Sequence, residues 1–263
     1  MEPILDVKQL CMDFGGLRAL NEVDFKIFEG EITALIGPNG AGKTTFFNCI
    51  SGIYKPTSGL VTMRKPGCSS NVTVNGFRPS KVASLGMTRT FQNIRLFQNM
   101  TVLENVMIGR HPKTNSGIFG SLLRSSKMRN EEKSIVADSY KLLEKMELAD
   151  LANEFAKNLS YGAQRRLEIA RAMAGEPFLI LLDEPAAGMN PQETIELDEL
   201  IRKIRDIDKI SILLIEHDMK LVMNISDRIY VLDYGSIIAS GSPDQIKSNE
   251  AVIKAYLGED ENA

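Results

Sequence analysis

The segment that ends in Lys43 and Thr44 has the composition of a loop that binds phosphate groups. The residues expected to contact phosphate are Gly37, Pro38, Asn39, Gly40, Ala41, Gly42, Lys43, Thr44 and Thr45. Glycines let backbone N–H groups turn inward around phosphate oxygens, and a following helix adds its positive N-terminal end. Lys43 would reach the β- and γ-phosphates, and the Thr44 hydroxyl would bind Mg²⁺. The alternative is an accidental glycine-rich turn, but the buried strand predicted at Ile32–Ile36 favours a nucleoside triphosphate site.

Two carboxylates follow another apolar run, Phe178-Leu-Ile-Leu-Leu182. The run predicts a buried strand, so Asp183 and Glu184 would emerge at its carboxyl end, where open α/β sheets bind ligands. Asp183 suits the shell of a Mg²⁺ ion, and Glu184 suits the orientation or deprotonation of an attacking water. Alone this pattern is common. Together with the phosphate loop it predicts hydrolysis of the nucleotide.

The stretch Leu159-Ser-Tyr-Gly-Ala-Gln-Arg-Arg166 resembles the signature motif of ATP-binding-cassette (ABC) proteins, usually Leu-Ser-Gly-Gly-Gln. Ser160 and Gly162 match the serine and the second glycine of the motif. Tyr161 replaces the first glycine, and Ala163 stands in the place of the glutamine. The alternative is that Ser160 is only the cap of the helix that follows. The resemblance implies that Ser160 and Gly162 contact the ATP held by a partner cassette.

Other motifs of that family can be matched to this sequence. Arg89-Thr-Phe-Gln92 resembles the Q-loop, in which Gln92 would touch Mg²⁺ or the lytic water. Ile215-Glu-His217 resembles the switch histidine, and His217 would hold the γ-phosphate, although a histidine is by default a surface or core residue. Phe14 stands where the family has an aromatic that stacks on adenine, although a phenylalanine there could equally be core. Asn190 replaces the usual Asp of the D-loop, so charge-based contacts from that loop are in doubt.

The resemblance covers essentially the whole chain, and several longer stretches resemble the larger ATPase of bacterial branched-chain amino-acid importers. They are Phe47–Ile50, Arg89–Phe97, Arg165–Arg171, Asp183–Gly188, Glu216–Val222 and Val252–Gly258. The resemblance implies ATP and Mg²⁺ as cofactors and a second ATPase, either another copy or a related smaller subunit. It also implies membrane permease subunits, a periplasmic binding protein reached only indirectly, and a cytoplasmic location on the inner face of the membrane.

Strand and helix patterns alternate around these motifs. The expected elements after residue 160 are a helix at 161–173, a strand at 178–182, a helix with Leu197, Leu200, Ile201 and Ile204 on one face, and a strand at 211–215. Such alternation predicts an α/β fold with a mainly parallel sheet flanked by helices, here a P-loop NTPase core. We expect this core to comprise residues 1–92 and 160–263. Within it, Val61–Arg78 carries two turn signals and predicts an antiparallel hairpin in an N-terminal β subdomain.

Residues 93–159 predict an inserted helical subdomain. Thr101 and Glu104 form a capping box, and Val136, Tyr140 and Leu143 recur at helical spacing. The segment His111–Arg129, rich in Gly, Ser and Lys, predicts a loop around a short apolar patch, Gly117–Leu123. Three large apolar residues, Ile94, Leu96 and Phe97, follow Gln92 directly. They predict either packing of the helical subdomain or a surface on which a permease docks.

Composition narrows the class of protein. The 263 residues are 43% hydrophobic and carry 31 basic and 34 acidic residues, so the net charge of −3 gives no sign of a nucleic-acid partner. No apolar run reaches the roughly 20 residues of a membrane helix, and the N-terminal residues do not resemble a signal peptide. Three cysteines without metal-like spacing indicate reduced thiols.

Two other classes of function remain as alternatives to an importer subunit. A soluble ABC ATPase that acts on ribosomes or DNA would usually show two cassettes or a long coiled coil, and this chain shows neither. An unrelated P-loop kinase or NTPase would not need Ser160 or His217 in these patterns.

Overall fold

A computed structural model of the chain describes residues 2–110 and 126–257. Its contacts divide the chain into two compact units, which we call the sheet unit (residues 1–89 and 178–263) and the helical unit (residues 90–177). The helical unit contains the whole of the expected insertion 93–159. It also contains the following segment, which carries Ser160 and was expected in the core.

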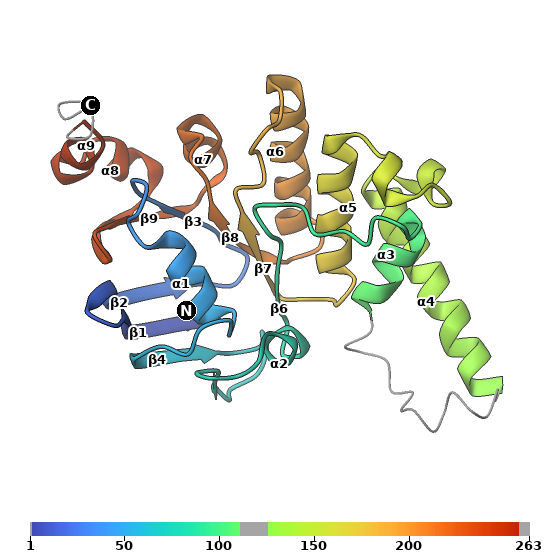
Figure 1. The fold of residues 1–263 in the computed structure, drawn as a ribbon, viewed down its shortest axis with the longest axis horizontal. Coiled ribbons are helices and arrows are strands. Elements are labelled where there is room, and N and C mark those ends of the chain that lie inside the picture. The colour runs from blue at the N-terminus through green and yellow to red at the C-terminus, as the bar shows by residue number, and fades with distance from the viewer. Residues whose placement is uncertain (1, 111–125, 258–263) are drawn as a thin grey trace. The chain divides into compact units, whose positions relative to one another are not determined.

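Among the described residues, the sheet unit contains a six-stranded sheet in the order β10-β9-β3-β8-β7-β6 (Figure 1). Its strands are β3 (Ile32–Ile36), β6 (Met87–Arg89), β7 (Leu179–Asp183), β8 (Ser211–Ile215), β9 (Arg228–Asp233) and β10 (Ser236–Gly241). Neighbouring strands are parallel except β9 and β10. Every residue of β3, β7 and β8 is buried, as in parallel strands covered on both faces. The predicted α/β class with a mainly parallel sheet is confirmed.

Successive residues of β3 pack on opposite faces of this sheet. Leu35 joins a core cluster with Phe46 and Phe47 of helix α1 (Lys43–Ile50). Ala34 joins a second cluster, whose helical members come from α7 (Met219–Ile225), α8 (Pro243–Lys247) and α9 (Glu250–Leu257). The unit also holds α2 (Pro79–Ser84) and α6 (Pro191–Asp206). Helix α6 buries the four residues predicted for its apolar face, Leu197, Leu200, Ile201 and Ile204.

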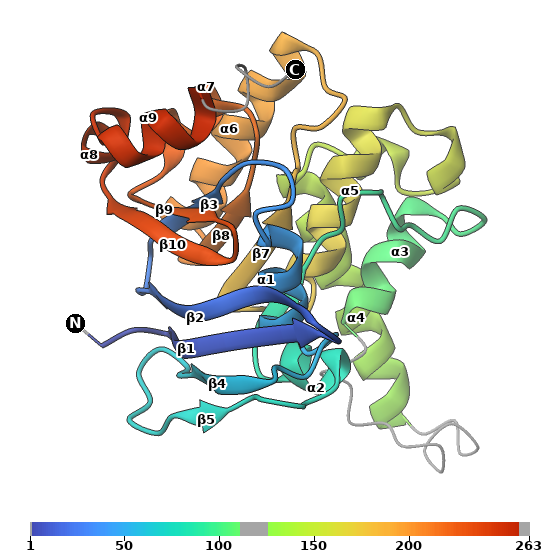
Figure 2. The same cartoon turned by 60° about the vertical axis from the view of Figure 1, so that its left-hand side comes forward.

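The predicted N-terminal β subdomain is an antiparallel sheet in the order β2-β1-β4-β5 (Figure 2). Its strands are β1 (Leu5–Phe14), β2 (Leu17–Ile27), β4 (Ser58–Met63) and β5 (Val72–Thr73). The predicted hairpin is present, since Thr62 pairs with Thr73 and Met63 with Val72.

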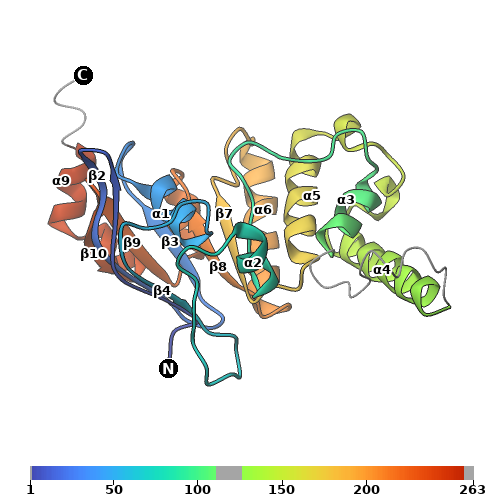
Figure 3. The same ribbon diagram turned by 60° about the horizontal axis from the view of Figure 1, so that its bottom comes forward.

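In the helical unit, helices α3 (Val102–Gly109), α4 (Ser126–Lys145) and α5 (Tyr161–Met173) pack together (Figure 3). Short 3₁₀ turns, η2 (Ala149–Leu151) and η3 (Ala156–Asn158), lead from α4 to α5. The capping box of Thr101 and Glu104 begins α3 as predicted. At its other end, a Cβ on Gly109 would lie 2.3 Å from the carbonyl oxygen of Arg171, so glycine allows α3 and α5 to approach closely.

One sequence prediction for this unit needs correction. The expected loop His111–Arg129 ends earlier, because helix α4 begins at Ser126; residues 111–125, with the patch Gly117–Leu123, lie outside the described residues. The helix predicted from Val136, Tyr140 and Leu143 is correct, but only Leu143 is buried, while Val136 and Tyr140 are exposed. Helical spacing identifies a face and does not show how much of it is covered. No helix among the described residues is long and apolar enough to cross a bilayer.

Candidate functional site

The loop between β3 and α1 depends on glycine at two positions. Gly42 has a φ of 106°, and a Cβ there would lie 2.7 Å from the carbonyl oxygen of Ala19. Gly37 has a φ of 152°, and a Cβ there would lie 1.9 Å from the carbonyl oxygen of Leu232. Both contacts are too short for a carbon atom, and other residues rarely adopt these φ values. The glycines therefore allow the tight backbone path that a phosphate-binding loop requires.

Lys43, the first residue of α1, lies within the curve of this loop. It is only 7% exposed, and its ammonium group donates hydrogen bonds to the carbonyl oxygens of Gly37 (2.6 Å) and Pro38 (2.8 Å). Gly42 occupies the capping position of α1, where most helices place a polar side chain. A glycine cap leaves that position to an anion, and the helix N-terminus attracts one. Charge and backbone geometry together suit a phosphate group.

Glu184 and His217 meet beyond the ends of two neighbouring parallel strands. Asp183, the last residue of β7, is paired with Ile215, the last residue of β8. The backbone N–H of Glu184 donates to the carbonyl oxygen of Ile215 (2.9 Å). His217 Nε2 lies 2.8 Å from Glu184 Oε1, so an imidazole and a carboxylate share a hydrogen bond. This pair can accept a proton and hold it at a defined place.

The backbone around Glu184 is strained and is held by a residue that the sequence analysis did not identify. Glu184 has a φ of 47°, and strained residues of this kind cluster at functional sites. Glu216, only 4% exposed, accepts hydrogen bonds from the backbone N–H groups of Ala186 (2.7 Å) and His217 (3.0 Å). Burial raises the pKa of Glu216, and these backbone donors oppose the rise. Its position beside His217, after a buried strand, was the available sequence signal.

Arg89 is a second residue of the sheet unit whose role the sequence analysis missed. Its guanidinium donates to Asp183 Oδ2 (2.7 Å) and to Asn48 Oδ1 (2.7 Å) on α1. The sequence analysis placed Arg89 only in the motif that leads to Gln92. No local pattern shows that a strand-ending arginine faces Asp183, because the two residues are 94 positions apart.

Phe14, at the end of β1, is not a core residue. Its side chain is 43% exposed, and its ring meets that of Tyr54 edge to face, with 5.4 Å between centroids and 80° between planes. Edge-to-face contact with one ring leaves the exposed part of Phe14 accessible to a planar ligand.

Gln92, Ser160 and Gly162 lie in the helical unit. Ser160 caps α5 and accepts a hydrogen bond from the backbone N–H of Ala163 (3.4 Å), so the capping alternative is observed. Ser160 is exposed and Gly162 is buried. Gln92 is exposed, and its carbonyl oxygen accepts a hydrogen bond from Arg165 (2.9 Å).

A buried ion pair on α5 holds the segment that carries Gln92. Arg165 and Glu168 are 0% and 1% exposed and lie 2.8 Å apart. Arg165 also donates to the carbonyl oxygen of Phe91 (2.8 Å), and Glu168 accepts from the backbone N–H of Arg95 (3.2 Å). Charges at i and i+3 on a buried helix face were the sequence signal for this pair.

The oxygen atoms near the phosphate loop are suitable ligands for a hard cation such as Mg²⁺. The Thr44 hydroxyl and the Asp183 carboxylate are oxygen ligands of the kind that Mg²⁺ prefers. Thr44 and Asn48 are four residues apart in α1 and share a face, and Arg89 joins Asn48 to Asp183. Asp183 therefore lies toward the face of α1 that carries Thr44. Residues 2–110 and 126–257 contain no group of three His, Cys, Asp or Glu side chains able to hold a metal.

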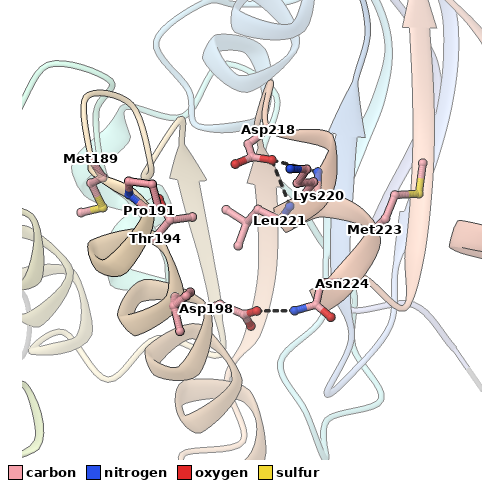
Figure 4. Close-up of a pocket in the computed structure, with 10 residues that line it drawn as sticks. Met189, Pro191, Thr194, Asp198, Asp218, Lys220, Leu221, Met223 and Asn224 are labelled. Carbon is pink, nitrogen blue, oxygen red and sulfur yellow. Dashed lines mark hydrogen bonds between the residues drawn. The ribbon is translucent and has the colours of Figure 1, made fainter.

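Two cavities of the sheet unit are lined partly by residues of the phosphate loop or by Asp218, which follows His217. One, of about 520 Å³, is lined by the loop residues Pro38–Ala41 together with Tyr234 and Lys254. The other, of about 750 Å³, lies between α6 and α7 (Figure 4). Asp218 caps α7 at its rim, while Asp198 and Asn224 are hydrogen-bonded across it. The larger cavity lacks the residues expected to contact phosphate, so the loop is the better candidate for a nucleotide.

Comparison with known proteins agrees with the motifs. Residues 20–187 match the family model described as ABC transporter, and residues 236–262 match the model described as branched-chain amino acid ATP-binding cassette transporter. The high-affinity branched-chain amino acid transport ATP-binding protein LivG of Escherichia coli (strain K12) is 49% identical over 258 residues, which cover 98% of this chain and 99% of that protein.

Solved structures give the same result. The ADP conformation of MJ1267, an ATP-binding cassette of an ABC transporter, has a TM-score of 0.82 and 30% identity, covering 98% of this chain and 100% of that one. A dimeric post-hydrolysis state of the cassette MJ0796, bound to ADP and Pi, has a TM-score of 0.71 and 26% identity, covering 91% and 98%. Family model, whole-length relatives and fold agree, and the chain therefore belongs to the ABC transporter family, as one of its ATP-binding ATPase subunits.

Proposed function

We propose that this chain hydrolyses ATP to drive an importer of branched-chain amino acids. One observation carries the proposal most directly: a phosphate loop and the contacting pair Glu184–His217 occur in the same compact unit. The loop supplies a binding site for the triphosphate, and the pair supplies a base with a hydrogen-bonding partner.

The loop and its neighbours would bind the nucleotide. Backbone N–H groups of the loop, except at Pro38, which has none, would donate to the phosphates, and the Lys43 ammonium would turn from the carbonyl oxygens of Gly37 and Pro38 to phosphate oxygens. Thr44 and Asp183 would hold Mg²⁺, which when bound neutralises developing negative charge on the phosphates. The exposed ring of Phe14 would stack on adenine.

Glu184 and His217 would act on the water and the γ-phosphate. Glu184 Oε1 accepts a proton from the attacking water, or orients it, while His217 holds the γ-phosphate and keeps Glu184 in place. The strained backbone at Glu184, supported by Glu216, fixes the carboxylate before the substrate arrives.

Gln92, Ser160 and Gly162 are the nucleotide contacts that we propose for the helical unit. Gln92 would touch Mg²⁺ or the lytic water. Ser160 and Gly162 would serve the ATP of a second cassette, so ATP would hold two ATPase subunits head to tail. The dimeric MJ0796 structure, of the same fold, supports this pairing. The partner is a second copy or a related ATPase.

Permease subunits would dock on the helical unit near Phe97. Ile94 and Leu96 are partly buried, but Phe97 is 48% exposed. Its backbone is held in both directions by the buried side chain of Asn105, through Phe97 N–H to Asn105 Oδ1 (2.9 Å) and Asn105 Nδ2 to Phe97 O (3.1 Å). A fixed backbone that presents an exposed aromatic ring suits a protein contact.

The cargo and location are inferred from relatives. LivG is named as a branched-chain amino acid transport protein, and the C-terminal match carries the same description. The chain would thus lie on the cytoplasmic face of the membrane through its permease, and a periplasmic binding protein would deliver the amino acid. A role on ribosomes or DNA is less well supported, since the net charge is −3.

Glu184→Gln tests the chemistry. The variant keeps size and hydrogen bonding but loses the base, so ATP hydrolysis should fall by orders of magnitude while ATP binding persists. Size exclusion with ATP should then show a trapped dimer, of this chain alone or with its co-expressed partner. Normal turnover would remove Glu184 from this role.

Phe97→Glu tests the docking surface against a matched control. Tyr140→Glu changes an aromatic of similar exposure (41%) on α4 of the same unit. Phe97→Glu should abolish permease co-purification and leucine uptake while isolated ATPase activity persists, and Tyr140→Glu should leave all three intact. Equal effects of the two variants, or normal assembly of Phe97→Glu, would exclude Phe97 as the contact.

A further inference from the structure

Arg89 is held at the junction of two elements that carry the nucleotide site. It ends β6, which lies parallel to β7 with Arg89 opposite Leu181. Its side chain is 9% exposed, and that of its partner Asp183 is 6% exposed. The Nη2–Oδ2 distance of 2.7 Å makes this a charge-assisted hydrogen bond shielded from solvent.

The other side of the guanidinium is bound to helix α1. Nη1 donates to Asn48 Oδ1 (2.7 Å) and to Ser51 Oγ (3.1 Å). The Ser51 hydroxyl in turn donates to the carbonyl oxygen of Phe47 (2.6 Å), and the guanidinium carbon lies 5.3 Å from the centroid of the Phe47 ring. Both nitrogens thus have acceptors, and the guanidinium lies within cation–π distance of the Phe47 ring.

These contacts join the two parts of the cation site. Asp183 comes from β7, while Thr44 and Asn48 come from one face of α1. A carboxylate as buried as that of Asp183 needs a counter-charge and a fixed orientation. Arg89 supplies both and links β7 to α1.

We propose that Arg89 is a positioning residue for the cation, which holds the Asp183 carboxylate toward the face of α1 that carries Thr44. The inference rests on the proposed ATPase function and adds a residue to it. Arg89 does not touch the nucleotide; it acts through Asp183. Loss of Arg89 should therefore reduce the enhancement of nucleotide binding by Mg²⁺ more than it reduces nucleotide binding in the absence of Mg²⁺.

The test measures binding of a fluorescent ATP analogue (mant-ATP) to the full chain, first in EDTA and then with increasing Mg²⁺. For Arg89→Met we expect unchanged affinity in EDTA, because the phosphate loop is intact. The Mg²⁺ concentration for half-maximal enhancement should rise about tenfold or more, the usual effect of removing a partner of a metal ligand. Arg89→Lys, which keeps the charge and one donor, should recover part of this loss.

A matched control is Arg64→Met. Arg64 belongs to the same unit, and its side chain is 17% exposed, but it binds Glu2 and the carbonyl oxygen of Pro3. Binding of mant-ATP by Arg64→Met should depend on Mg²⁺ in the same way as binding by the unchanged protein. Thermal melting of each variant checks folding. If Arg89→Met does not fold, Asn48→Ala, which removes one acceptor, should show a smaller shift in the same direction.

The outcomes distinguish a failure of the proposed ATPase function from a failure of the positioning role of Arg89. An unchanged protein that binds no mant-ATP would overturn the proposed function. Normal binding in the unchanged protein, with the same Mg²⁺ dependence in Arg89→Met or Asn48→Ala, would overturn the positioning role. A loss of affinity in EDTA equal to the loss in Mg²⁺ would also overturn it, since Arg89 would then support only the loop.

Discussion

The sheet unit and the helical unit each bury an arginine against a carboxylate, but the two pairs are built differently. Arg89 and Asp183 end two neighbouring strands and are 94 positions apart in the chain. Arg165 and Glu168 are three positions apart on one helix, α5. The first pair joins β6 and β7 to α1, whereas the second binds the backbone of residues 91–95.

The difference separates two uses of a buried charge. In the sheet unit, the carboxylate is itself a candidate cation ligand, so its arginine prepares a group that later meets Mg²⁺. In the helical unit, both charges are enclosed, at 0% and 1% exposure, and their other hydrogen bonds go to the backbone of residues 91–95 and to the Tyr161 hydroxyl. We therefore expect loss of Arg165 to act mainly on stability, whereas loss of Arg89, which also removes a counter-charge, should in addition change the response to ligand.

The largest effect on stability should come from Arg165→Met. It leaves Glu168 buried without its counter-charge, which typically costs about 3–5 kcal/mol of unfolding free energy. Urea denaturation would measure the loss. Arg165→Met together with Glu168→Leu should recover most of it, because an apolar pair of similar size avoids the buried charge. If the double variant were no more stable than the single one, the backbone contacts of residues 91–95, rather than the charge, would explain the cost.

The second prediction contrasts the two arginines by their response to ligand. Addition of Mg²⁺ with a non-hydrolysable ATP analogue should raise the melting temperature of Arg165→Met more than that of Arg89→Met, because Arg165 holds only the backbone carbonyl of Gln92, whereas Arg89 binds the side chain of the candidate cation ligand Asp183. Arg89→Met should lose about 1.4 kcal/mol of this stabilisation at saturating ligand, the equivalent of a tenfold weaker affinity. Equal ligand responses in the two variants would remove the distinction between the pairs.

A smaller loss of stability is expected when a helix cap is removed from either unit. Thr101 begins α3 and Asn190 begins α6, each in a complete capping box. Thr101→Ala and Asn190→Ala should each cost about 1 kcal/mol, because each removes an acceptor for helix N–H groups. Chemical denaturation of both variants would check this. A much larger cost for Asn190→Ala would show a role for that loop beyond capping.

The smallest loss of stability is expected for a partly exposed ion pair. Arg202 and Asp198 lie 2.7 Å apart on α6, with the Arg202 side chain 37% exposed. Arg202→Met should change stability by less than about 1 kcal/mol, since solvent screens such pairs. If Arg202→Met lost as much unfolding free energy as Arg165→Met, burial would not determine how much stability is lost when an ion pair is broken.

Local features of the chain were predictable from the sequence. The glycines of the phosphate loop, the apolar run before Asp183 and the cap at Ser160 each act over a few residues. The bounds of α5 follow from such signals, and its predicted range 161–173 agrees with the structure. Turn chemistry, capping and strand burial are short-range effects, so their signals survive in a single sequence.

Contacts between distant segments were decided only by the tertiary structure. Nothing near Arg89 in sequence shows that it faces Asp183, and nothing near Glu216 shows that it holds the backbone of Ala186. The sequence left open whether Phe14 was core, and the helical spacing of Tyr140 did not show whether its side chain is covered; both side chains are exposed. Burial and pairing depend on which other segment packs against a residue, and spacing along one segment does not carry that information.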